Sequence, residues 1–139
     1  MVRENRAEEQ AKAQLETVRE LIQAYHKAGE AEDSDAQDEA IRRIEENILS
    51  LEVREGWHNP SQTYEGGPVE FQILLCTGGP AVRIIGDLDG NNEPCNVQLQ
   101  YQDWGTPWTE YFLDLDSKAG ETPEEDDLTD YCRTFCFAY

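Results

Sequence analysis

Apolar residues in the first fifty positions recur at spacings of three and four, the period of an amphipathic α-helix. The first stripe, over residues 4–28, consists of Ala11, Leu15, Val18, Ile22 and Tyr25. The second, over residues 35–50 and running on to the next position, consists of Ile41, Ile44, Ile48 and Leu51. In this interpretation Gly29 ends the first helix, and Ser34 forms a capping box with Gln37 at the start of the second. The pattern predicts an antiparallel helical hairpin that packs on a sheet or on a second copy of the chain.

After the second helix the apolar period changes to two, which is typical of half-buried strands. We expect strands at residues 51–57, 69–75, 81–88, 97–101 and 108–113. The third of these is apolar on both faces, so it is predicted to be central in the sheet. The segment Gly90-Asn91-Asn92 tolerates positive φ and predicts a hairpin turn between the third and fourth strands.

A short third helix is predicted near the end of the chain. Pro123 suits the first helical position, and four acidic residues follow it in the first turn. The apolar face of this helix consists of Leu128, Tyr131, Cys132 and Phe135. The fold class is therefore α+β: an N-terminal antiparallel helical hairpin (residues 1–51), then a four- to five-stranded antiparallel sheet with a short C-terminal helix (residues 52–139), all in one compact domain.

The chain of 139 residues has 30 acidic and 11 basic residues, a formal net charge of −19. Such a surface repels nucleic acid and anionic lipid and attracts proteins whose working surface is basic. No run of about 18 apolar residues and no apolar leader segment is found, so we expect a cytoplasmic protein with no membrane partner. In a reducing compartment the four cysteines are expected to be free, mostly buried thiols. They are Cys76, Cys95, Cys132 and Cys136.

Two segments contain residue types that can bind metal ions. The run from Asp87 to Asn92 resembles the start of a calcium loop, but that pattern needs glycine at the sixth position, where Asn92 lies, and glutamate at the twelfth, where Gln98 lies. Cys132 and Cys136 are spaced for one face of a helix, whereas zinc requires four ligands and no second pair has suitable spacing. We therefore predict a hairpin turn, buried thiols and no bound metal.

The sequence also contains no recognisable catalytic motif. His26 and His58 are the only imidazole bases, one near a helix end and one in a loop that contains proline. The turn from Thr77 to Pro80 lacks the lysine and the glycine spacing of a phosphate-binding loop. Carboxylates are too numerous to single out a catalytic pair. We predict no enzymatic activity, no catalytic residue and no cofactor.

The three tryptophans are candidates for either the core or an interface. Trp57 is predicted to fill the core. Trp104 and Trp108 flank a Gly-Thr-Pro turn, where both environments remain open. Aromatic side chains beside acidic residues are common anchors in protein interfaces, so these two are included in the candidate partner-binding set.

The acidic residues are distributed unevenly. From Glu52 onward there are 17 of them against four basic residues, whereas the hairpin has 13 against seven. The candidate partner-binding acids lie within one short segment: Asp114, Asp116, Glu121, Glu124, Glu125, Asp126, Asp127 and Asp130. A carboxylate row of this density could occupy a basic groove that normally binds phosphates. The same composition is also typical of a solvated acidic linker.

Four segments resemble a group of small acidic proteins of phages and prophages, over about residues 50–139. They are LEVREGW, EFQILLCTGGPAVRIIGDLD, LQYQDWGTPWTEY and LTDYCRTFCFAY. The resemblance implies no catalytic residues. It implies a counter-defence role, a class that includes anti-CRISPR proteins, some of which fill DNA-binding channels.

Two functions follow as hypotheses. The first is an anti-CRISPR-type inhibitor in the host cytoplasm, which binds a basic CRISPR effector complex of the Cascade kind through its acidic side chains. It would block nucleic-acid binding by DNA mimicry and would not bind nucleic acid directly. The alternative is a phage structural or oligomeric protein, such as a homodimer, that associates through the helical hairpin.

Overall fold

The computed structural model describes residues 6–61, 67–78, 80–111 and 123–137. These residues form three helices and one five-stranded antiparallel sheet, so the predicted α+β class is confirmed. In chain order the elements are α1 (Arg6–Glu30), α2 (Ser34–Asn47), β1 (Ser50–Glu55), β2 (Pro68–Cys76), β3 (Ala81–Leu88), β4 (Pro94–Gln102), β5 (Thr109–Glu110) and α3 (Pro123–Arg133).

The sheet is a simple meander in the order β1-β2-β3-β4-β5. Its register places Ile73 opposite Ile84, and Ile84 opposite Leu99, so three apolar side chains line up on one face. On the opposite face the register places Gln72 beside Ile85 and Ile85 beside Gln98. The period of two along each strand therefore becomes one apolar and one mainly polar face.

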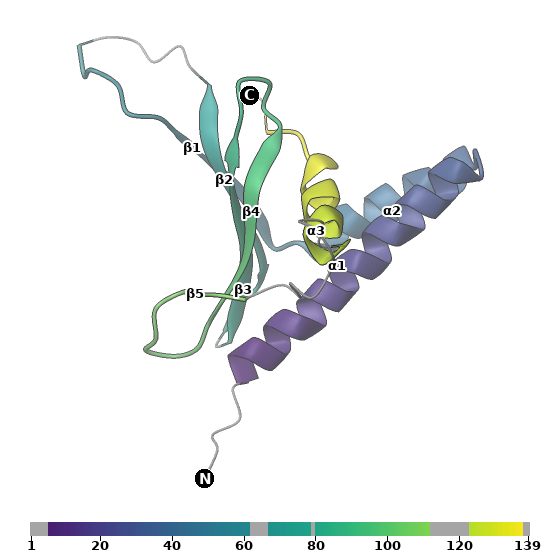
Figure 1. The fold of residues 1–139 in the computed structure, drawn as a ribbon, viewed down its shortest axis with the longest axis horizontal. Helices are drawn as coiled ribbons and strands as arrows, with labels where there is room; N and C mark the ends of the chain where they lie inside the picture. The colour runs from purple at the N-terminus through teal and green to yellow at the C-terminus, as the bar shows by residue number, and fades with distance from the viewer. Residues whose placement is uncertain (1–5, 62–66, 79, 112–122, 138–139) are drawn as a thin grey trace.

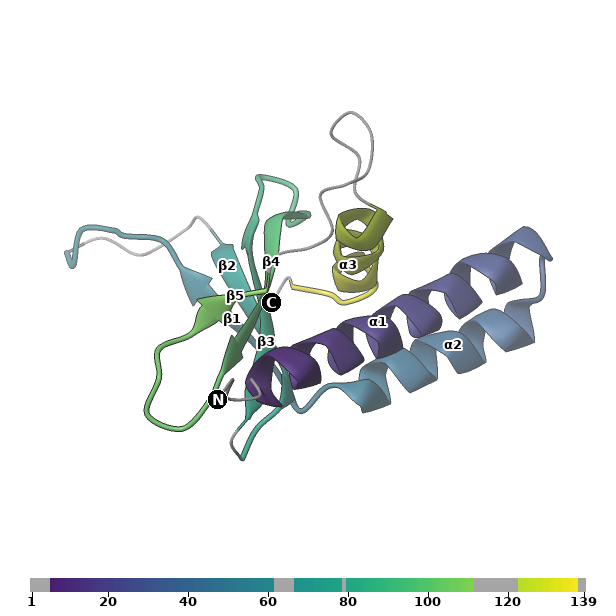
Figure 2. The same cartoon turned by 60° about the horizontal axis from the view of Figure 1, so that its bottom comes forward.

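The helices cover only the apolar face of the sheet. α1 crosses this face beside α3, and α2 packs along α1 at a greater distance from the sheet (Figures 1 and 2). The far end of the α1–α2 hairpin projects beyond the sheet. In the parts of the chain that the structure describes, none of the helices is both long and apolar enough to traverse a lipid bilayer.

The start of α2 differs from the sequence prediction. Its N-cap is Asp33, with extended backbone angles, and the Asp33 carboxylate accepts a hydrogen bond from the Ala36 amide at 3.1 Å. The predicted capping box on Ser34 is thus wrong by one residue. Asp33 can take this position because Glu32 adopts a positive φ of 54°, which turns the chain sharply after α1. The first helix continues to Glu30, one residue past the predicted stop.

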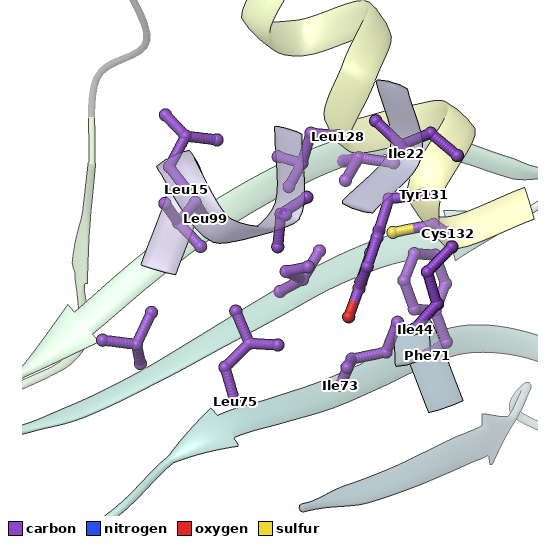
Figure 3. Packing of buried hydrophobic residues seen from close by; sticks show 14 of the residues in the cluster. Leu15, Ile22, Ile44, Phe71, Ile73, Leu75, Leu99, Leu128, Tyr131 and Cys132 are labelled. Atoms are coloured by element: carbon purple, nitrogen blue, oxygen red, sulfur yellow. The ribbon is translucent and has the colours of Figure 1, made fainter. Parts of the chain in front are cut away.

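One hydrophobic cluster joins the hairpin, the sheet and α3 (Figure 3). Its fully buried members include Ile22 of α1, Ile44 of α2, Ile84 of β3 and Leu128 of α3. Tyr131 is also buried, and its hydroxyl accepts a hydrogen bond from the Asn47 side chain at 3.1 Å. The hairpin is therefore part of the core, because its narrow stripe contacts the sheet and the other helices.

Gly86 makes room for an aromatic contact at the end of the core. It lies opposite Phe71 in the β2–β3 register, and a Cβ atom at Gly86 would lie 2.6 Å from the Phe71 ring. The ring can lie flat over the strand only because glycine has no side chain. Phe137 then packs on Phe71, with ring centroids 4.7 Å apart. This contact fixes the chain after α3 to the sheet.

Candidate partner-binding surface

The second face of the sheet is not covered by any of the described elements (Figures 1 and 2). We refer to it as the open face. It carries a shallow groove of about 660 Å³, lined by side chains from β1 to β4. Most of the lining is polar, with Gln72, Gln98 and Asn96 among the amides and Ile85 as a half-buried apolar contact. Amide groups on a flat strand surface suit hydrogen bonding to another protein.

Arg83 lies near the centre of the open face, half-buried on β3. Its Nε donates a hydrogen bond to Gln100 Oε1 at 2.9 Å, and its Nη1 donates to Gln72 Oε1 at 2.7 Å. The guanidinium carbon lies 4.1 Å from the centroid of the Trp108 ring, a cation–π contact. Burial lowers the pKa of Arg83, which means that the cation has lost part of its hydration. Three side chains, from β2, β4 and the segment before β5, thus hold one oriented guanidinium.

Acidic side chains from β1, β2 and β3 also line the groove. Glu70 forms an ion pair with Arg54 of the neighbouring strand. Asp87 accepts a hydrogen bond from the Asn96 side chain at 3.0 Å. Glu52, on the edge strand, lies 3.5 Å from the Gln72 amide nitrogen. The groove therefore presents the Arg83 cation at one end and carboxylates from three neighbouring strands.

Two exposed tryptophans stand on the connections that border the open face. Trp57 follows β1 and is fully exposed, and Trp104 lies in the β4–β5 turn with 79% of its surface exposed. The prediction that Trp57 fills the core is wrong, because it lies beyond the end of the strand that the helices cover. Both connections extend to the side of the sheet opposite the helices (Figures 1 and 2). The candidate residue Trp104 is exposed, whereas Trp108 is half-buried against Arg83.

The Trp104 turn is held by its own hydrogen bonds. The Asp103 carboxylate accepts from the Trp104 amide at 2.8 Å, and the Thr106 hydroxyl accepts from the Asp103 amide at 3.1 Å. Gly105 has a φ of +73°, a conformation that glycine adopts without strain. An exposed aromatic side chain on such an ordered turn loses little entropy when a partner buries it.

The predicted acidic row is only partly exposed. Asp127 accepts hydrogen bonds from Arg19 Nε at 2.9 Å and Gln23 Nε2 at 3.2 Å, so it fastens α3 to α1. Asp130 lies 3.2 Å from His26 Nε2 and accepts from Arg133. These two candidate acids are therefore paired within the chain itself, which leaves them less available to a partner.

The other members of the row divide into two groups. Asp126 is exposed. Asp114, Asp116 and Glu121 lie outside the described residues, as do the side chains of Glu124 and Glu125.

A second acidic cluster lies at the projecting end of the hairpin, outside the candidate acidic row. Its members, which we call the hairpin-tip acids, are Glu30, Glu32, Asp33, Asp35, Asp38 and Glu39, and all are exposed. Arg42 lowers the pKa of Glu39 through a hydrogen bond. Asp33 caps α2. Within the described residues the other four make no ion pair. In the sequence this cluster is visible as six acidic residues within residues 30–39, around the connection between the two helices.

The residues on which a hairpin-driven dimer would depend are inside the monomer. Leu15 is 3% exposed and Ile44 is fully buried. A charged side chain at either position would destabilise the folded monomer. Loss of a dimer in such a variant would therefore not show that these residues form a dimer contact.

The cysteines are free, as expected, but only Cys132 is buried; Cys136 is exposed and the other two are half-buried. Burial raises the pKa of the Cys132 thiol far above its usual range. The segment considered as a calcium loop is a turn in which the Asp89 carboxylate accepts hydrogen bonds from the Asn91 and Glu93 amides. Among the described residues no group of three or more His, Cys, Asp or Glu side chains is arranged to hold a metal ion.

Comparison with protein-family models, with curated proteins and with solved structures finds no match. The resemblance to phage proteins therefore stays a prediction, and the surface itself has to support any functional conclusion.

Proposed function

We propose that this protein is a non-catalytic binding protein whose open face and acidic surroundings dock on a basic surface of a host protein complex. The observation that carries the proposal is the pair of exposed tryptophans, Trp57 and Trp104, on the two connections that border an uncovered sheet face. Burying a side chain of this size in an interface contributes about 2 to 3 kcal/mol. Tryptophan is also the residue type most enriched among binding hot spots.

The charge supports a basic partner. A formal net charge of −19 raises the association rate with a positively charged surface and repels nucleic acid. The hairpin-tip acids and the exposed Asp126 contribute to this field. Because such attraction between exposed charges is screened by salt, the affinity should fall as ionic strength rises.

The specific target that we propose is a CRISPR effector complex of the Cascade kind, in the cytoplasm of a phage-infected host. This choice rests on the resemblance of residues 50–139 to phage proteins. Effector complexes hold nucleic acid in positively charged channels. An acidic protein that occupies such a channel blocks DNA binding without any catalytic step, metal or cofactor. Carboxylates that imitate DNA phosphates are one form of this proposal, and tryptophan-anchored docking beside the channel is the other.

The test is a competition assay with purified components. A CRISPR effector complex is incubated with labelled target DNA and increasing amounts of this protein, and bound DNA is followed by gel mobility shift. We expect inhibition at low salt that weakens as salt is raised. Two variants separate the two forms of the proposal: Trp57→Ala with Trp104→Ala removes the anchors, and amide substitutions of the hairpin-tip acids Glu30, Glu32, Asp35 and Asp38 remove unpaired charge.

Loss of inhibition in the tryptophan variant alone would identify tryptophan-anchored docking, and loss in the amide variant alone would identify mimicry by the hairpin tip. Full inhibition by both variants, or inhibition that does not change with salt, would contradict the proposed surface. A complete lack of inhibition would exclude that effector as the target. Affinity purification from host lysate, with the tryptophan variant as the matched bait, then shows whether any basic complex depends on these anchors.

A further inference from the structure

Arg83 is a half-buried cation on a strongly acidic protein, yet none of the described carboxylates pairs with it. Its guanidinium contacts the side-chain oxygens of Gln72 and Gln100 and the ring of Trp108. These use Nε and one hydrogen of Nη1, whereas guanidinium carries five N–H donors in a planar fork. The remaining donors belong to a side chain that lines the groove of the open face.

Arg54, the other arginine of the groove, differs from Arg83 because it has a carboxylate partner. Arg54 lines the same groove, is largely exposed, and pairs with Glu70. Arg83 is more deeply placed and is instead oriented by neutral groups, which fix its plane but leave its charge uncompensated. A partly desolvated guanidinium held in one orientation is the arrangement that favours a charge-assisted, two-bond contact with a carboxylate.

We propose that Arg83 is the centre of a carboxylate-binding subsite, which takes one aspartate or glutamate side chain of the partner protein. That the ligand is a protein rests on the proposed function. The acidic side chains around Arg83 also restrict which residues can flank the bound carboxylate. Glu52 and Asp87 line the same groove, so basic side chains next to the bound carboxylate would meet acidic groups. The partner segment is therefore an acidic residue flanked by lysine or arginine.

A phosphate polymer does not fit this groove. Glu52, Glu70 and Asp87 would lie beside its neighbouring phosphates, and the net charge of −19 repels a polyanion as a whole. A single carboxylate within a basic protein segment avoids both penalties. The groove therefore favours a protein segment of mixed charge over nucleic acid.

The test uses two capped tripeptides that differ in one group: lysine-glutamate-lysine and lysine-glutamine-lysine. Binding is followed through the indole N–H resonance of Trp108 in ¹⁵N NMR spectra, assigned from its loss in Trp108→Phe. A charge-assisted pair of hydrogen bonds contributes about 1.5 kcal/mol or more, so the glutamate peptide should bind about tenfold more tightly than the glutamine peptide. In Arg83→Gln this ratio should fall to one or below, because the acidic protein attracts the more positive glutamine peptide.

Two further variants keep the result interpretable. Arg43→Gln removes an exposed arginine of α2, which does not line the groove, and should leave the tenfold preference unchanged. Arg83→Lys keeps the positive charge without the planar fork and should retain only part of the preference. Thermal unfolding of each variant checks that the sheet is intact.

An equal affinity of the wild-type protein for the two peptides would overturn the proposal, and so would a preference that survives in Arg83→Gln. Tighter binding of inorganic phosphate than of the glutamate peptide would overturn the assignment to a protein carboxylate. The peptide assay does not involve the host complex, so its failure is distinct from failure of the competition assay. If Arg83 shows no preference while the tryptophan variant still loses inhibition, the proposed function stands and this subsite does not.

Discussion

Replacement of Gly86 by alanine is the sharpest test of how the core is arranged. A Cβ atom at this position would lie 2.6 and 2.7 Å from two carbons of the Phe71 ring and 3.1 Å from the Cys95 carbonyl oxygen. Ordinary contacts between carbon atoms are about 3.5 to 4.0 Å. The ring would have to move by roughly 1 Å, and it is buried against Phe137.

The magnitude follows from two opposed effects. Alanine in place of glycine within a strand stabilises by about 0.5 to 1 kcal/mol through the backbone. Overpacking a filled core costs about 1 to 3 kcal/mol. We expect a net loss of about 1 to 2 kcal/mol in the free energy of unfolding, which lowers the Tm of a chain of 139 residues by about 3 to 8 °C.

The assay is thermal and urea unfolding of Gly86→Ala beside a matched control, Gly90→Ala. Gly90 has no positive φ, and nothing lies within 4 Å of its Cβ position, so that variant should be as stable as the wild type or more stable by up to about 1 kcal/mol. Phe71→Leu in the Gly86→Ala background should remove the clash, giving a coupling energy of at least about 0.5 kcal/mol. Equal Tm values for the two alanine variants would refute the placement of Phe71 over Gly86.

Three further predictions concern the helices. Asp127→Asn weakens the ion pair that joins α3 to Arg19 and should cost about 1 kcal/mol in urea unfolding. Arg19→Gln should cost less in the Asp127→Asn background than in the wild type, and strictly additive effects would contradict the pairing. Asp33→Ala removes the cap of α2 and should cost about 1 kcal/mol, whereas Ser34→Ala should have little effect; the reverse order would refute the assigned cap. Burial raises the pKa of Tyr131 to about 12, so the folded state keeps a proton that the unfolded state loses above about pH 10. Stability should therefore fall by about 3 kcal/mol as pH rises through that window, and Tyr131→Phe should flatten the loss measured by urea midpoints.

The proposed partner-binding surface could be anticipated only in part from the sequence. For Trp104, which flanks a Gly-Thr-Pro turn, the sequence left the core and an interface open, and the structure shows an exposed side chain. Trp57 was assigned to the core, since it ends a segment with strand-like alternation. Its exposure depends on where the helices lie, because β1 is an edge strand and its outer half extends past them.

The acidic residues of the C-terminal segment also have partners that the sequence does not reveal. Asp127 and Arg19 are 108 positions apart, and only the docking of α3 beside α1 brings them together. Arg83 was counted as one of the few basic residues after Glu52, with no sign that Gln72, Gln100 and Trp108 surround it. Those contacts come from the antiparallel register and the β4–β5 turn, which no local pattern specifies.

What the sequence by itself determined is the type of each element and the side that it buries. Residues such as Ile22, Ile73 and Leu99 follow periods of 3.6 or 2, and these periods place them on one side of a helix or strand whatever the partner. Tertiary structure decided which polar side chains meet and which face stays uncovered. The physical reason is that apolar burial depends on the local repeat, whereas ion pairs, stacked rings and exposed surfaces depend on the relative placement of distant elements.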